Sequence, residues 1–248
     1  MWYGVYTNHL STGHTRVKAS PLMEVAPLAS RTLLRVGRGL AGFSALLVAV
    51  MVMVAGCGAP QFTYVADSAA NTYFKVPYGW HKIDNASLEK TLNNGGGSGA
   101  WSVAYDAGTA PSATHVFSAQ ISQPFAFALV GQLNSTESNQ ISYNGLRDFL
   151  LPVTSAARTN ASKSGFPLTG FQLLHDAVLA PGQGVHGVRV TFDYTYPDGS
   201  IDTFDQIAFL NAESTKVYVL MVHCETSCYS RDLSQINTVM TSFTVRSS

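Results

Sequence analysis

Hydrophobic and polar residues alternate most regularly in the C-terminal half of the chain. From 188 to 196 every second residue is Val, Phe or Tyr, and the residues between them are polar or charged. A period of two is typical of a β-strand with one buried face. Residues 197–200 read Pro-Asp-Gly-Ser, and an Asp-Gly pair tolerates the positive φ of a hairpin turn. The pattern therefore predicts a hairpin whose second strand covers 201–210.

The same pattern continues to the C-terminus. A second turn at 213–216 leads into an apolar run at 217–222, which predicts a central strand. Apolar residues at helical spacing then predict an amphipathic helix over 230–241, closed by Phe-Thr-Val at 243–245. Upstream, we expect strands at 73–77, 80–83, 101–105 and 125–130, a helix at 85–92 capped by Asn85, and a helix at 138–151 stopped by Pro152. This is an α+β domain, an antiparallel β-sheet meander flanked by helices.

The N-terminal quarter has a different pattern. Residues 40–56 are 17 uncharged, mostly apolar residues that follow Arg31, Arg35 and Arg38. A basic flank, an apolar run and small residues at its end form a secretory signal, and this run is shorter than the roughly 20 residues of a spanning helix. We expect 1–56 to be a removed signal peptide; a short membrane anchor is the alternative. Residues 1–22 fit no part of a signal, which favours a start at Met23 or Val36.

The run ends in Val54-Ala55-Gly56-Cys57, and this tetrapeptide resembles the bacterial lipobox. The resemblance implies that the thiol of Cys57 receives a diacylglycerol, with acyl chains such as palmitate, and that a peptidase cuts before it. Two acyl chains suffice for stable anchoring. We therefore expect a lipoprotein at the extracytoplasmic face of the cell membrane. Residues 57–70 would be its lipidated tether and 71–248 its globular domain.

Removal of the signal changes the charge balance. The whole chain has 15 Lys and Arg against 15 Asp and Glu, but after residue 56 ten basic residues face fourteen acidic ones, a net charge of −4. No basic cluster remains in that part. Nucleic acid is therefore excluded as a partner, and attachment to a membrane has to come from the lipid, since both nucleic acid and anionic surfaces need basic clusters.

Two further cysteines, Cys224 and Cys228, lie between the last predicted strand and the final helix. Export would place them where disulfides persist. A bridge between them would fix that helix to the sheet and contribute about 2 kcal/mol for so short a loop. The alternative is a metal site formed by both cysteines, His223 and one more ligand. Because the sequence has no second cysteine pair, we expect a disulfide and no metal.

No catalytic motif is present, and no cofactor is implied. Ser98 lies in a glycine-rich run that lacks the last glycine of a nucleophile elbow and the lysine of a phosphate loop. The histidines form no metal-binding motif, so we interpret them as surface or packing residues; His175 and Asp176 with His186 are the weak metal alternative. The aspartates Asp193, Asp198, Asp202 and Asp205 are interpreted as a solvated hairpin end, with calcium as the alternative.

Two short stretches resemble a known family. Residues 73–80, Tyr-Phe-Lys-Val-Pro-Tyr-Gly-Trp, are similar to the entry strand of PsbP-like domains and of actinobacterial lipoproteins that share their fold. The ending of that family, a strand, a helix and Ser-Phe-x-Val, is matched down to Ser242-Phe243-Thr244-Val245. The resemblance implies an α/β/α sandwich used for binding or assembly, without a shared catalytic set.

Two classes of function follow. The first is a non-enzymatic binding or assembly module of the cell envelope, whose ligand is an envelope protein or an apolar envelope molecule. The second is an envelope hydrolase with an unrecognised active site. A perturbed His–Asp or Ser–His pair in a closed pocket would favour the hydrolase. An open aromatic groove without a titratable cluster would favour the binding module.

Overall fold

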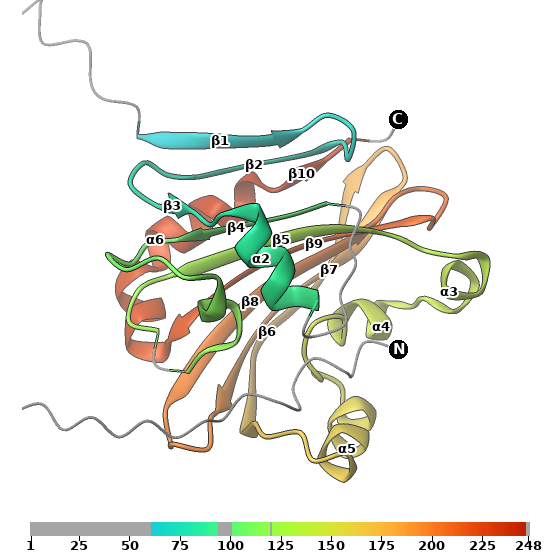
Figure 1. Ribbon diagram of the computed structural model, residues 1–248. Helices are drawn as coiled ribbons and strands as arrows, with labels where there is room; N and C mark the ends of the chain where they lie inside the picture. Colours follow the sequence, from blue (N-terminus) through green and yellow to red (C-terminus); the bar gives the residue numbers. More distant parts are fainter. Residues whose placement is uncertain (1–60, 94–100, 120, 247–248) are drawn as a thin grey trace, which may run out of the picture. The chain divides into compact units, whose positions relative to one another are not determined.

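The computed structural model describes residues 61–93, 101–119 and 121–246, which form two antiparallel sheets and six helical segments (Figure 1). The large sheet has the strand order β3 (His81–Lys82), β4 (Trp101–Asp106), β5 (Phe125–Gln132), β9 (Lys216–Glu225), β8 (Ile201–Leu210), β7 (Val185–Thr195) and β6 (Thr169–Gly182). The small sheet has the order β1 (Phe62–Asp67), β2 (Thr72–Pro77) and β10 (Thr244–Val245). The helical segments are α2 (Asn85–Asn93), the 3₁₀-helix η1 (Ala113–Phe117), α3 (Ser135–Gln140), α4 (Tyr143–Arg147), α5 (Ser155–Lys163) and α6 (Thr226–Ser242). The predicted α+β class, an antiparallel sheet flanked by helices, is confirmed.

Helices cover both faces of the large sheet. Successive side chains of a strand point to opposite faces, and two neighbours on β8 show which helix covers which face. Asp205 accepts a hydrogen bond from Tyr229 of α6, whereas the Gln206 amide donates to the carbonyl oxygen of Leu146 in α4. One face therefore lies on α6, together with the small sheet that contacts the same helix, and the other lies under α4 and its neighbours (Figure 1).

The two stretches that carried the family resemblance contact each other. The rings of Phe74 and Phe243 meet edge to face at 6.3 Å between centroids. The backbone N–H of Lys75 donates to the Oγ of Ser242 at 3.0 Å. Gly79 adopts φ +109° in the turn that follows β2, and this turn buries Trp80. Both motifs thus join the first strands of the domain to its last helix.

The folded part begins earlier than the sequence analysis placed it. The tether was expected to run to residue 70, but 62–67 form β1, which pairs along its whole length with β2. Val65 is buried against the core, while Tyr64 and Ala66 on either side are exposed. Side-chain exposure thus alternates along this part of β1, but the strand is short. The Gly, Pro and Ser residues near it made the segment look like a tether in the sequence.

Two other expectations were wrong. The single helix expected at 138–151 is two short ones, because Asn134 caps α3, Ser142 caps α4, and Ile141 between them is extended. The cap of α2 is Asp84, whose carboxylate accepts the N–H of Ser87, and not Asn85. Strand β6 and helix α5 were not predicted at all.

Within the described residues, no helix combines the length and the apolar character needed to cross a bilayer.

Candidate functional site

A row of directly paired residues crosses the large sheet from edge to edge on the face opposite α6. From β3 to β6 it consists of His81, Asp106, Phe125, His223, Phe204, Phe192 and Leu173. The ring of His223 stacks on Phe204 at 5.0 Å, and Phe204 stacks on Phe192 at 5.6 Å. Such cross-strand aromatic pairs are the unit of sheet stabilisation. The four residues from Phe125 to Phe192 therefore form a continuous aromatic seam that includes His223.

His223 is paired with Asp202 inside this seam. The distance from its Nδ1 to the carboxylate is 3.5 Å, and neither side chain is exposed to solvent. Neither ring nitrogen and neither carboxylate oxygen has a hydrogen-bond partner among the described residues. Buried polar atoms are normally hydrogen-bonded, so this pair is costly. A His–Asp pair is also the arrangement that orients a general base, but no substrate reaches a pair that is fully enclosed.

A second His–Asp pair lies nearer the surface. Asp106, at the end of β4, is buried. One of its carboxylate oxygens, Oδ2, lies 2.6 Å from the Nδ1 of His115. The same carboxylate accepts the backbone N–H groups of Gly108 and Ser112. Three interactions thus engage its two oxygens, and the loop after β4 folds around it. This pair organises the loop, and its carboxylate is buried.

The face toward α6 holds a fully bonded network. Arg189 donates two hydrogen bonds to Asp205, at 3.0 and 2.6 Å, and one to the side chain of Asn237 in α6. Tyr229, also in α6, donates to the same carboxylate at 2.8 Å. The two hydrogen bonds that Arg189 donates to Asp205 raise the pKa of Arg189, and burial raises the pKa of Tyr229. The network fixes α6 to strands β7 and β8.

The hairpin aspartates are not a solvated cluster, contrary to the sequence analysis. Asp202 and Asp205 are fully buried on opposite faces, and Asp193 is nearly so. Burial raises the pKa of Asp193, although the Thr203 hydroxyl donates to it at 2.7 Å. Only Asp198, in the turn itself, is exposed. The alternating pattern hid this arrangement because both faces of β7 and β8 are covered.

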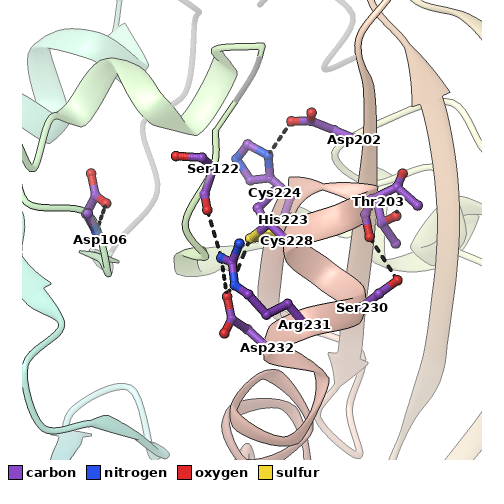
Figure 2. The surroundings of a disulfide bond; sticks show 12 residues. Asp106, Ser122, Asp202, Thr203, His223, Cys224, Cys228, Ser230, Arg231 and Asp232 are labelled. Atoms are coloured by element: carbon purple, nitrogen blue, oxygen red, sulfur yellow. Dashed lines mark hydrogen bonds and ion pairs between the residues drawn. A yellow bond between two sulfur atoms is a disulfide. The ribbon is translucent and has the colours of Figure 1, made fainter. Parts of the chain in front are cut away.

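Cys224 and Cys228 form a disulfide, as predicted, with Cα atoms 5.9 Å apart (Figure 2). It joins the end of β9 to the first turn of α6, and both residues are buried. Three residues further along α6, Arg231 donates to the carbonyl oxygen of Ser122 and to Asp232. Figure 2 shows the His223 ring turned toward Asp202 close to this disulfide. The start of α6 is therefore held both by a covalent bond and by a contact to the loop before β5.

The metal site considered as an alternative for His175, Asp176 and His186 is not formed. Both carboxylate oxygens of Asp176 accept from the Nε of Arg147 in α4, and His186 contacts the carbonyl oxygen of Gly184. His175 neighbours Asp176 on the strand and so points to the other face. In the described ranges, no group of three or more His, Cys, Asp and Glu residues is placed to hold a metal ion. Cys57 and Ser98 lie outside those ranges.

Strand β6 presents the most exposed apolar side chains of the large sheet. It is an edge strand that pairs only with β7, and its register shifts at three points along that pairing. Leu173 is 48% exposed, Leu174 46% and Val178 56%. Leu173 and Val178 pair with buried residues of one face and flank the Arg147–Asp176 ion pair. We call Leu173, Leu174 and Val178 the β6 patch.

Nothing in the sequence pattern singled out His223, Asp202 or the β6 patch. His223 was considered as a ligand beside the cysteines and otherwise as a surface or packing residue. Asp202 was considered as part of a solvated hairpin end, with calcium as the alternative. The signal that was available for His223 is its place directly after the apolar run at 217–222, and Asp202, in a strand without regular alternation, had none. The β6 patch had no such signal.

No protein-family model matches the sequence, and no curated protein matches it. Solved structures do. The chain is similar to cyanobacterial PsbP (CyanoP) from Synechocystis sp. PCC 6803, with 14% identity and a TM-score of 0.49 over 77% of this chain and 96% of that one. It is also similar to LpqN, involved in cell envelope biogenesis of Mycobacterium tuberculosis, with 16% identity and a TM-score of 0.41 over 75% and 91%.

A third similar structure is the Ran-binding protein Mog1p of Saccharomyces cerevisiae, with 10% identity and a TM-score of 0.39 over 74% of this chain and 95% of that one. The three proteins have different biological settings. At these identities and TM-scores no functional residue is carried over from any of them.

Proposed function

We propose that this protein is a non-enzymatic binding or assembly module of the cell envelope, held at the extracytoplasmic face of the membrane by a lipid on Cys57. The observation that carries the binding role is the β6 patch, an apolar surface on the free edge of the large sheet. The lipid anchor is supported by the signal-like run and by the Val-Ala-Gly-Cys tetrapeptide at 54–57. The two motifs at 73–80 and 242–245 support an assignment to the PsbP-like lipoproteins of actinobacterial type.

The partner is expected to be a protein. Exposed edge strands pair readily with other chains, and exposed apolar patches mark sites of protein contact. The three register shifts of β6 limit unspecific pairing along the whole edge, because bulges twist an edge away from regular strand addition. Contact through side chains such as Leu173 and Val178 remains open to a complementary surface.

An envelope hydrolase is the alternative. It would need a reactive group that a substrate can reach, and the one unsatisfied His–Asp pair of the described residues is fully enclosed. Asp106 and His115 are engaged in holding a loop. The geometry therefore favours binding over hydrolysis.

The anchor is tested by intact-mass analysis of protein extracted from membranes. We expect cleavage before Cys57 and a mass increment of a diacylglycerol on its sulfur. The variant Cys57→Ala is expected to accumulate as unprocessed precursor. An unmodified Met1 or Met23 at the mature N-terminus contradicts the proposal.

The binding role is tested by placing a photo-crosslinking residue at Val178 in the native membrane. We expect one discrete protein adduct, lost when Leu173→Asp is added. The control is Leu233→Asp, which changes a leucine of similar exposure on α6 and is expected to leave the adduct intact. A lipid adduct in place of a protein one would show the apolar-ligand alternative, and loss of the adduct in both variants would contradict a role of the β6 patch.

A further inference from the structure

The small sheet has two unlike faces. The inner face, with Val65, Phe74 and Val76, is buried against the core. The outer face consists of the residues that alternate with these along the paired strands: Phe62, Tyr64, Ala66, Tyr73, Lys75, Pro77 and Thr244. β1 is the edge strand of this sheet, and two of its outer-face residues, Tyr64 and Ala66, are exposed (Figure 1).

The outer face combines aromatic rings with cations. The Nζ of Lys75 lies 4.6 Å from the ring centroid of Phe62, and the guanidinium of Arg246 lies 4.8 Å from that of Tyr73. Tyr64 is 79% exposed, and Tyr78, directly after β2, is 67% exposed. None of the outer-face residues is acidic. This differs from the rest of the domain, where acidic residues outnumber basic ones.

The position of this face along the chain connects it to the proposed anchor. Four residues, 58–61, separate Cys57 from Phe62 at the start of β1. An extended chain spans at most about 3.3–3.6 Å per residue, so the Cα of Phe62 lies within about 18 Å of that of Cys57. A lipid on Cys57 would therefore hold β1 next to the lipid headgroups.

We propose that the outer face of the β1–β2–β10 sheet lies on the phospholipid surface, with Tyr64 and Tyr78 among the headgroups and Lys75 and Arg246 facing the phosphates of anionic lipids. Tyrosine is enriched at membrane interfaces because its ring is apolar and its hydroxyl is polar. Lysine extends its charged end to the headgroups while its stem follows apolar surface. The inference rests on the proposed lipid at Cys57.

The charge balance defines what this face does. Two cations attract an anionic surface only weakly, and the domain as a whole is acidic. The lipid supplies the attachment, and the aromatic and basic face sets the orientation. The β6 patch lies on the other sheet, at its free edge, and so stays available to a partner (Figure 1).

The test uses the lipidated full-length product, purified from membranes and reconstituted into phosphatidylcholine and phosphatidylglycerol vesicles with brominated acyl chains. Tyr64→Trp places a fluorescent reporter on the outer face, and Tyr78→Trp serves as a second variant. The control Tyr143→Trp lies on α4, against the opposite face of the large sheet, and is also exposed. Emission from the native tryptophans is subtracted with the parent protein.

We expect brominated vesicles to remove roughly half of the added emission of Tyr64→Trp and of Tyr78→Trp, since both would lie at the interface, and to leave Tyr143→Trp unchanged. We also expect the quenching to weaken when phosphatidylglycerol is omitted. Intact mass establishes lipidation in the same samples. Lipidated protein in which neither reporter is quenched, or all three are quenched alike, overturns the inference but leaves the proposed anchor standing. Protein without the lipid overturns both.

Discussion

The two faces of strand β8 each bury an aspartate, Asp205 toward α6 and Asp202 toward the aromatic seam. Asp205 accepts three hydrogen bonds from Arg189 and Tyr229, so its charge is compensated where it lies. Asp202 has only His223 at 3.5 Å, and both of its oxygens lack a hydrogen-bond partner among the described residues. The same residue type is therefore buried three positions apart at very different energetic cost.

The two layers on either side of the large sheet thus differ in how their buried polar groups are hydrogen-bonded. On the α6 side, polar groups serve packing: the network of Asp205 and the disulfide of Cys224 both fix the helix to the sheet. On the other side, a polar pair is retained within an aromatic seam that apolar residues would fill more favourably. We expect removal of polar groups to destabilise the first layer and not the second.

The largest effect is expected for Asp205→Ala. Removing one partner of a buried, bonded ion pair leaves Arg189 uncompensated and costs about 3–5 kcal/mol of unfolding free energy. The control is Asp176→Ala, which breaks the more exposed pair with Arg147 and should cost less than about 1 kcal/mol. Urea denaturation measures both. Equal losses in the two variants would show that the network does not hold α6.

Reduction of the disulfide is expected to have the next largest effect. Opening the short loop between Cys224 and Cys228 should lower the unfolding free energy by about 2 kcal/mol, by the loss of chain constraint in the unfolded state. Thiol titration of the oxidised protein should find neither cysteine free. A chelator should change nothing, and thiols that appear on chelation would instead indicate a metal site.

The opposite sign is expected on the other face. Asp202→Leu combined with His223→Phe replaces the unsatisfied pair with apolar groups inside the seam. Such replacements are often neutral or stabilising, and we expect a gain on the order of 1 kcal/mol in unfolding free energy. A clear loss of stability would mean that the pair has a compensating partner, such as an ordered water. Thermal and urea unfolding of the double variant against the parent decides this.

The smallest effect concerns Asp193, whose pKa is raised by burial. A carboxyl with a raised folded-state pKa favours folding while protonated, and this contribution is lost as the pH rises through the folded pKa. Asp193→Asn keeps an acceptor for Thr203 without the charge. We therefore expect its melting temperature to match the parent in acid, below the ordinary pKa of aspartate, and to exceed it slightly at neutral pH. A constant difference across this range contradicts the assignment.

The sequence predicted strands correctly where the residues on at least one face of the strand are all apolar. The alternation at 188–196 and the apolar run at 217–222 correspond to β7 and β9, and Gly199 has the positive φ expected of its turn. It failed at β6, because three register shifts interrupt the period of two and most of the strand is exposed. It also treated alternating polar residues as exposed, although α6 covers them.

The candidate site was still less predictable. The pairing of His223 with Asp202 depends on strand register, which places Phe204 opposite His223 and Asp202 opposite Glu225. No local spacing encodes that relation between two strands. The disulfide, by contrast, is formed by residues four apart, and short-range chemistry of this kind can be read directly from a sequence.

The order of strands has a consequence for how the chain reaches this structure. Strands β6 to β9 and helix α6 pair with segments adjacent in sequence, so they can form early. Phe125 pairs with His223, and Thr72 pairs with Val245, so β5 and β2 have to wait for partners from the far end of the chain. If the chain is synthesised or exported from its N-terminus, β5 and β2 lack these partner strands until the C-terminal segments follow. During that time their unpaired edges and apolar side chains are exposed, and chaperones can bind them.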